Sequence, residues 1–186
     1  MRPRAPAERQ KRMPDIWHDV AVATLDTNLR VLRPSRKAPL PGDVFAVQVP
    51  DSSYRFGRVI RDDATWTLAE GAGPAVLVYI YTVRANELAV PSREELRPGG
   101  LLLPPMMTNR LPWTRGYFAT VDHLPLDEAD VLTPHCFFSA SRGIHFDADG
   151  HMLQSPSQPV GDFGLHSFRT IDDAISDALS IPRANT

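Results

Sequence analysis

The chain has 186 residues, of which 20 are lysine or arginine and 22 are aspartate or glutamate, so its formal net charge is −2. This balance excludes a strongly basic nucleic-acid-binding protein and a highly acidic tail protein, and the length allows one compact domain or at most two. A hydrophobic fraction of 42% excludes a wholly disordered chain, and Cys136, the only cysteine, excludes an internal disulfide. No apolar run approaches the length of a membrane span, so we expect a cytoplasmic protein without a membrane partner.

The N-terminal part of the chain is basic and the remainder is acidic. Residues 1–40 hold nine basic and four acidic residues, a net charge of +5, which leaves −7 for the rest. Residues 1–14 are rich in arginine and proline, so we expect a disordered basic arm, either a solvated tail or a contact to nucleic acid or an acidic partner. Residues 15–38 are expected to form an N-terminal extension and linker, and residues 39–186 the main domain.

Strand patterns dominate the first half of the main domain. Residues 44–49 and 54–60 alternate between two faces and are separated by a turn-forming Pro-Asp-Ser-Ser segment, which predicts a β-hairpin. Residues 75–81 are apolar at every position and predict a central strand buried on both faces. Ser92 and Glu95 have the spacing of a capping box, but the following Pro-Gly-Gly segment limits that helix to about one and a half turns.

Further strands and one helix are expected in the second half. Residues 116–121 read as a strand, and residues 136–153 as a hairpin that includes an Asp-Gly turn. Apolar residues at helical spacing predict an amphipathic helix over residues 171–179, with Thr170 as its N-cap. We therefore expect an α+β fold, mainly antiparallel β in a small barrel or a strongly bent sheet, with a C-terminal amphipathic helix.

Metal-binding chemistry is suggested most strongly by the sequence His-Phe-Asp-Ala-Asp-Gly-His. The candidate ligands are His145, Asp147 and His151, with Asp149 between them. The same residues are typical of an Asp-Gly turn between strands, and the glycine stands at the wrong position for an EF-hand. We favour the turn, so neither a metal nor another cofactor is predicted.

No pattern identifies a catalytic residue. The Gly-x-Ser-x-Gly motif is absent, Cys136 is expected to be a buried structural cysteine, and the glycine-rich segment at 71–74 does not open a helix. The acids Asp127, Glu128 and Asp130 fit a solvated surface as well as acid chemistry. Enzymatic activity is therefore less expected than binding.

Interface-type residues gather between Met106 and Phe118. The segment holds Trp113, Arg115 and Tyr117, residue types that are enriched in protein interfaces. The same residue types fill ordinary β-rich cores, and the core is favoured for Phe118 and Trp113. The candidate partner-binding residues are Trp113, Arg115, Tyr117, Asp127, Glu128 and Asp130.

Three blocks in the main domain resemble a known family. They are PGDVFAVQVPDSSYRFGRVI, VLVYIY and LLLPPMMTNRLPWTRGYF, in this order. Together they resemble the immunity protein 26 family of bacterial polymorphic toxin systems, with which HocA-type phosphotriesterases are grouped. The resemblance runs from about residue 39 to residue 126. Its matching positions are Gly42, Asp43, Phe45, Tyr54, Gly57, Arg58, Val59, Tyr79, Tyr81, Leu102, Pro104, Trp113, Gly116, Tyr117 and Phe118.

The resemblance implies a bacterial immunity-type protein that binds and neutralises a cognate toxin without catalysis. The acidic main domain is compatible with a basic toxin. Nucleic acid is expected as a partner only through the basic arm. The alternative that the resemblance leaves open is a small metal-assisted hydrolase of phosphotriesters or organophosphates.

Overall fold

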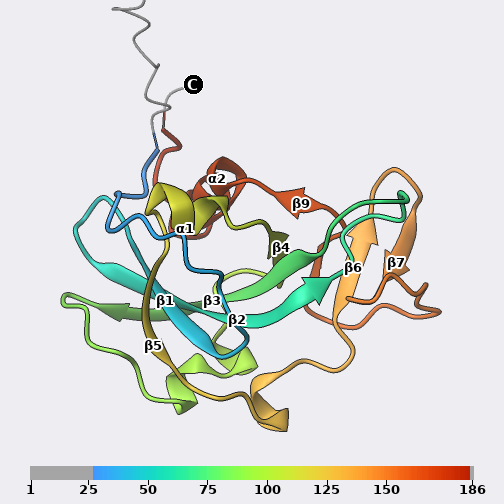
Figure 1. Ribbon diagram of the computed structural model, residues 1–186, viewed down its shortest axis with the longest axis horizontal. Coiled ribbons are helices and arrows are strands. Elements are labelled where there is room, and N and C mark those ends of the chain that lie inside the picture. Colours follow the sequence, from blue (N-terminus) through green and yellow to red (C-terminus); the bar gives the residue numbers. More distant parts are fainter. Residues whose placement is uncertain (1–26, 185–186) are drawn as a thin grey trace, which may run out of the picture.

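A six-stranded sheet forms the centre of the fold in the computed structural model, which describes residues 27–184 (Figure 1). The strand order is β5-β1-β2-β3-β4-β9, with all neighbours antiparallel except β4 and β9. The strands are β1 (Asp43–Gln48), β2 (Tyr54–Ala64), β3 (Ala75–Ala85), β4 (Met106–Thr108), β5 (Ala119–His123) and β9 (Leu165–His166).

A smaller sheet and several short helices complete the structure. The second sheet has the order β7-β6-β8, in which β6 and β7 are antiparallel and β6 and β8 are parallel. Its strands are β6 (Cys136–Ser139), β7 (Ile144–Phe146) and β8 (Val160–Asp162). The helices are α1 (Leu111–Arg115) and α2 (Phe168–Ala178), with the 3-10 turns η1 (Glu94–Leu96), η2 (Pro98–Gly100) and η3 (Glu128–Asp130).

This architecture confirms the expected α+β class, with mainly antiparallel sheets and a C-terminal helix. In the part of the chain that the structure describes, β5 and β9 are the ends of the large sheet and do not pair with each other, so there is no closed barrel. Of the described helices, none has the length and apolar character needed to cross a membrane.

The predicted hairpin and central strand are both present. β1 and β2 pair in register from Val44 opposite Arg58 to Gln48 opposite Tyr54. Residues 75–81 form the fully buried half of β3, which lies between β2 and β4. The apolar run is continuous because both faces of this sheet are covered.

The two faces of the large sheet contact different cores. One core contains Phe45, Trp113, Phe118 and Ile171, so it lies under α1 and α2. The other contains Phe56, Leu77, Tyr79, Tyr81 and Leu96, so it lies on the side of η1. In Figure 1 the two α-helices accordingly lie above the sheet, and the green η turns lie below it.

The strand predicted over residues 116–121 begins later than expected. Leu111–Arg115 is helical, and Gly116 ends this helix in the left-handed conformation with φ 86°. A Cβ on Gly116 would lie 2.8 Å from the backbone nitrogen of Pro34, so a glycine is needed for this turn and for the close packing. β5 therefore starts at Ala119.

The hairpin predicted over residues 136–153 is present in a modified form. β6 and β7 pair around the turn at residues 140–143, and the Asp-Gly turn follows β7. An isolated bridge between Phe146 and Met152 closes that second turn.

The C-terminal helix starts earlier than predicted. α2 begins at Phe168, and its N-cap is Ser167, whose side chain accepts a hydrogen bond from the Thr170 amide. Thr170, the predicted cap, lies within the first turn. Ile171 and Ile175 face the core, as the helical spacing predicts.

The described part of the N-terminal extension packs against the main domain. The Leu32 amide donates to the Gly116 carbonyl at 2.8 Å, and the Ser35 amide donates to the Trp113 carbonyl at 2.9 Å. The predicted basic arm, residues 1–14, and residues 15–26 of the extension lie outside the described residues.

Candidate functional site

The acidic segment at residues 127–130 forms the turn η3. Asp127 caps this turn by accepting a hydrogen bond from the Ala129 amide at 2.9 Å, and the Asp130 side chain accepts one from the Asp127 amide at 3.0 Å. This reciprocal capping box explains why two acids three residues apart fold locally into a turn.

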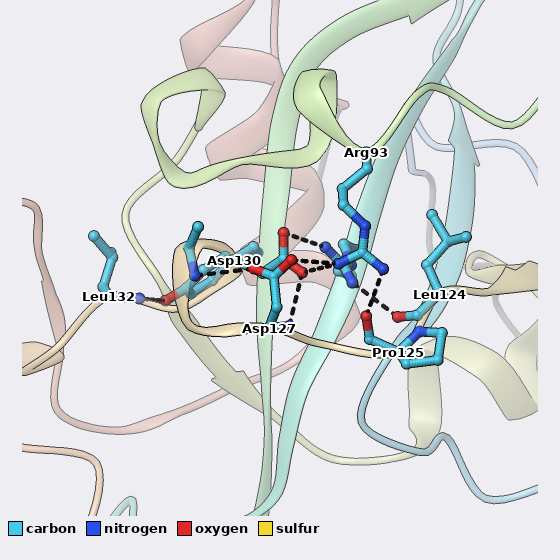
Figure 2. A network of polar contacts seen from close by, with 9 residues as sticks. Arg93, Leu124, Pro125, Asp127, Asp130 and Leu132 are labelled. Carbon is cyan, nitrogen blue, oxygen red and sulfur yellow. Dashed lines mark hydrogen bonds and ion pairs between the residues drawn. The ribbon is translucent and has the colours of Figure 1, made fainter.

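Two arginines from distant segments hold η3 in place (Figure 2). Arg58 on β2 lies with its Nη1 3.1 Å from Asp130 Oδ1. Arg93, which precedes η1, contacts Asp130 Oδ2 at 2.6 Å and Asp127 Oδ2 at 2.9 Å. We call these four residues the arginine–aspartate network.

Backbone carbonyls tie the same arginines to the segment before η3. Arg58 Nη2 donates to the Leu124 carbonyl, and Arg93 Nη2 donates to the Pro125 carbonyl, both at 2.8 Å. The contact between Arg58 Nη1 and Asp130 Oδ1 is an ion pair without hydrogen-bond geometry, since neither atom has a hydrogen-bond partner. Residues 124–130 are therefore clamped against the sheet by charge and by hydrogen bonds.

Burial divides the predicted acidic residues into two groups. The Asp130 side chain is 0% exposed, so it positions the turn and is not available to a partner. Asp127 and Glu128 are exposed, and so is Glu94 on η1. The turns η1 and η3 are linked by Arg93, which precedes η1 and pairs with Asp127. We call Glu94, Asp127 and Glu128 the acidic corner; the segments around η1 and η3 that carry these residues lie at the bottom of Figure 1.

The aromatic candidates lie on the opposite side of the sheet from the acidic corner. Trp113 is 1% exposed and packs edge-to-face against Phe45 and Phe118, so its core interpretation is the one the structure supports. Tyr117 is half-buried and stacks on Phe168. Arg115 is exposed. The six predicted partner-binding residues therefore do not form one surface.

A second polar group lies beside the network. The Tyr79 hydroxyl accepts a hydrogen bond from the Leu132 amide at 3.0 Å and lies 2.6 Å from His135 Nε2. Which atom donates in the bond between Tyr79 and His135 depends on the tautomer of the ring. Burial, helped by the charge of Arg61, lowers the pKa of His135 to about 4. His135 is therefore neutral near pH 7.

The structure brings together only part of the predicted metal site. Asp147, Asp149 and His151 lie close enough to share an ion, whereas His145 instead packs against Phe138. Asp149 Oδ1 is 2.6 Å from Arg61 Nη2, and Asp147 Oδ1 accepts hydrogen bonds from the amides of Asp149 and His151. A guanidinium thus already pairs with one of the two carboxylates of the cluster, and the geometry of the cluster is that of a capped turn.

The sequence analysis did not identify Arg58 and Arg93 as partners of the acidic segment. Arg58 was named only as a position that matches the family blocks. One signal was available: Arg58 interrupts the otherwise apolar strand face of Phe56 and Ile60, and a charge that is buried in a sheet needs an opposite charge. Nothing in the local pattern around Arg93 indicated that it would reach η3, because the two segments are more than thirty residues apart.

A model of the immunity protein 26 family matches residues 40–145, which is more than half of the chain. This range contains the complete arginine–aspartate network and most of the large sheet. No curated protein and no solved structure shows a significant match.

Proposed function

The chain belongs to the immunity protein 26 family, and we propose that it binds a cognate bacterial toxin and neutralises it by occupying the toxin surface, without catalysis. The family match over residues 40–145 is the observation that carries this proposal. Membership implies a toxin-neutralising role, and we further propose that the partner is basic and that the acidic corner contacts it.

The acidic corner suits such a contact because its carboxylates are exposed while their backbone is held rigidly. Glu94, Asp127 and Glu128 are exposed, and Asp127 contacts the partly exposed guanidinium of Arg93. Fixed charges of one sign speed the association of an oppositely charged partner and lower the entropy lost on binding. The buried Asp130 contributes indirectly, because it fixes the turn that presents Asp127 and Glu128.

The proposal is tested by co-expression with the toxin encoded beside the gene. The wild-type protein should restore growth, and Glu94→Lys with Glu128→Lys, which leaves the Asp127 cap intact, should weaken toxin binding by about tenfold or more, mainly through a slower association rate. The binding rates of the purified proteins, measured at two salt concentrations, check this, since steering by charge weakens with salt.

Glu70→Lys with Glu87→Lys is the matched control. Both of these acids are exposed, and neither forms an ion pair among the residues that the structure describes. This double variant changes the net charge by the same amount as the test variant. If it weakens binding equally, net charge and not the acidic corner is responsible; if no neighbouring toxin is neutralised by the wild type, the proposed function is wrong.

A further inference from the structure

A strip of exposed basic residues lies where the N-terminal extension passes α1. We call it the basic strip, and its members are Arg33, Arg36, Lys37 and Arg115. Backbone hydrogen bonds from Leu32 and Ser35 to the C-terminal end of α1 hold the two segments together. In the described part of the chain, no acidic residue forms an ion pair with any member of the strip. These positive charges are therefore available to a partner.

A hollow of about 170 Å³ lies between the basic strip and the end of the large sheet. The extension and the strands β1 and β5 form its wall, through Arg33, Ser35, Lys37, Ala38, Asp43, Ala119 and Thr120. Two basic side chains of the strip, those of Arg33 and Lys37, thus border one concave site.

The polar side chains of this hollow offer hydrogen-bond donors. Arg33 Nη2 makes a long contact of 3.5 Å to the Thr120 carbonyl, which leaves the other N–H groups of the guanidinium unused among the described residues. The Ser35 hydroxyl oxygen accepts from the Lys37 amide at 3.2 Å, so the hydroxyl proton remains available. The Lys37 ammonium group adds three donors. The hollow therefore suits a ligand that supplies acceptor oxygens.

The carboxylate in the lining does not cancel the positive charge. Asp43 is 3% exposed and already has partners: Oδ2 accepts from the Leu40 amide at 3.1 Å, and Oδ1 lies 3.0 Å from Nδ1 of His123. The exposed Asp122 of β5 lies outside the lining. Two exposed cations against one buried carboxylate give the hollow a positive net charge.

The ligand that fits is an oxyanion that belongs to a larger polyanion. Arg36 and Arg115 extend the positive charge beyond the hollow, so one small anion would leave them unused. Three of the four members of the strip are arginines, whose planar guanidinium groups pair with phosphate oxygens in a bidentate way. The basic residues at positions 1–14 precede the strip in the same chain. A phosphodiester chain meets these conditions, because every linkage carries a negative charge.

We propose that the basic strip binds the phosphate backbone of a nucleic acid, with one phosphate group in the hollow between Arg33 and Lys37. The strip contains no aromatic side chain for stacking on a base, so the binding does not depend on base sequence. This surface is separate from the acidic corner, and the proposal does not rest on the toxin binding proposed above.

The proposal is tested by titrating a fluorescently labelled oligothymidine with the full chain at several salt concentrations. Four phosphate contacts predict a slope of about −2.8 for the logarithm of the association constant against the logarithm of the salt concentration. The affinity should therefore fall roughly fiftyfold between about 50 mM and 200 mM salt. No saturable binding at the lowest salt concentration would overturn the proposal. Equal affinity for a polyglutamate of the same length would assign the strip to an acidic polypeptide and would also overturn it.

Variants assign the binding to the hollow. Arg33→Ala with Lys37→Ala should weaken oligothymidine binding about tenfold or more at about 100 mM salt and reduce the steepness of the slope by about 1.4, because two phosphate contacts are lost. Both side chains are exposed, so this variant is expected to fold.

Arg84→Ala with Arg142→Ala is the matched control. These exposed arginines lie on β3 and in the turn between β6 and β7, and their loss changes the net charge by the same amount. The control should keep the slope of the wild type. Equal weakening by the two double variants would assign the binding to net charge and contradict the proposed site.

Toxin binding distinguishes the basic strip from the acidic corner. Arg33→Ala with Lys37→Ala should leave the rate of toxin association unchanged, because the acidic corner lies on the other side of the sheet (Figure 1). If this variant weakened toxin binding and left oligothymidine binding unchanged, the strip would belong to the toxin interface and the nucleic-acid proposal would be wrong. Neutralisation of the toxin without any oligothymidine binding would refute the strip proposal alone.

Discussion

Arg58 is a charged residue inside the core, and its position depends on Asp130. Both side chains are 0% exposed, and their atoms come within 3.1 Å of each other. Removing two charges from water is costly, so such a pair adds little net stability, but either partner alone is strongly unfavourable. The pair therefore specifies where residues 124–130 lie more than it strengthens the fold.

Loss of one partner of this pair is expected to be severe. Asp130→Ala should lower the free energy of unfolding by about 3–5 kcal/mol, because the buried guanidinium of Arg58 is left uncompensated. Replacing both residues by apolar ones, as in Arg58→Met with Asp130→Leu, should restore much of this loss. Urea unfolding measures both. Asp127→Ala is the control and should cost about 1 kcal/mol, since Asp127 is exposed; equal costs for Asp127→Ala and Asp130→Ala would contradict this account.

Acid pH is expected to destabilise the protein through His135. Its pKa is about 4 in the folded state and 6.5 in the absence of burial, so the unfolded chain takes up the proton first. The contribution of His135 to stability should be constant above about pH 7 and fall between pH 6.5 and pH 4, with a total loss of roughly 3 kcal/mol. His166 contributes in the same direction, because burial also lowers its pKa.

Urea unfolding at a series of pH values checks this expectation. The variant His135→Gln lacks the titrating ring, so its stability should fall less steeply between pH 6.5 and pH 4. An equally steep decline in wild type and variant would assign the effect to other groups.

At the scale of elements, short segments are held by a few specific contacts. The start of α2 is an example: the Ser167 side chain accepts from the Thr170 amide at 3.2 Å. The second example is Asp172 on α2, which accepts hydrogen bonds from the amides of Asn28 and Leu29 and so attaches the N-terminal extension to the helix. Elements in this fold are therefore joined by side-chain-to-backbone bonds as well as by apolar packing.

The position of the α2 cap can be tested directly. Ser167→Ala should lower the free energy of unfolding by about 1 kcal/mol, because it leaves a first-turn amide without its acceptor. Thr170→Ala should cost clearly less, since Thr170 lies inside the helix. Thermal or urea unfolding of the two variants measures the difference. A larger loss for Thr170→Ala would favour the cap that the sequence pattern predicted.

At the scale of the whole molecule, one group of exposed basic residues lies beside α1. Arg33, Arg36 and Lys37 are exposed next to α1, where Arg115 is also exposed. The acidic corner lies on the other side of the sheet, and Figure 1 shows the blue extension and α1 above it and the η turns below. The charges are not separated completely, because Asp177 on α2 is exposed on the helix side and Arg93 lies within the acidic corner.

The basic residues 1–14 are expected to contribute nothing to the stability of this fold. Their deletion should leave the Tm unchanged within about 2 °C, because the described residues contain the cores on both faces of the sheet. Differential scanning calorimetry of the truncated and full chains makes the comparison. A loss of more than about 5 °C would show that these residues pack on the domain.

Local patterns predicted the elements whose side chains repeat with a clear period. The β1–β2 hairpin, the buried strand β3 and the apolar face of α2 follow from alternation, from a continuous apolar run and from helical spacing. The predicted ends of elements were wrong where a single residue sets the end of a helix: Gly116 ends α1, and Ser167 caps the start of α2. Short strands such as β8 and β9 were missed because two or three residues carry no recognisable period.

By itself, the sequence determined the α+β class, the main strands and the resemblance to a toxin-immunity family, because these depend on local periodicity and on ordered blocks of residues. Only the tertiary structure decided that Asp130 is buried while Asp127 and Glu128 remain exposed, and that Arg33 and Lys37 border one hollow with Thr120. The physical reason is that burial and pairing join residues that are far apart in the chain: Arg58 and Asp130 are more than seventy positions apart yet in contact.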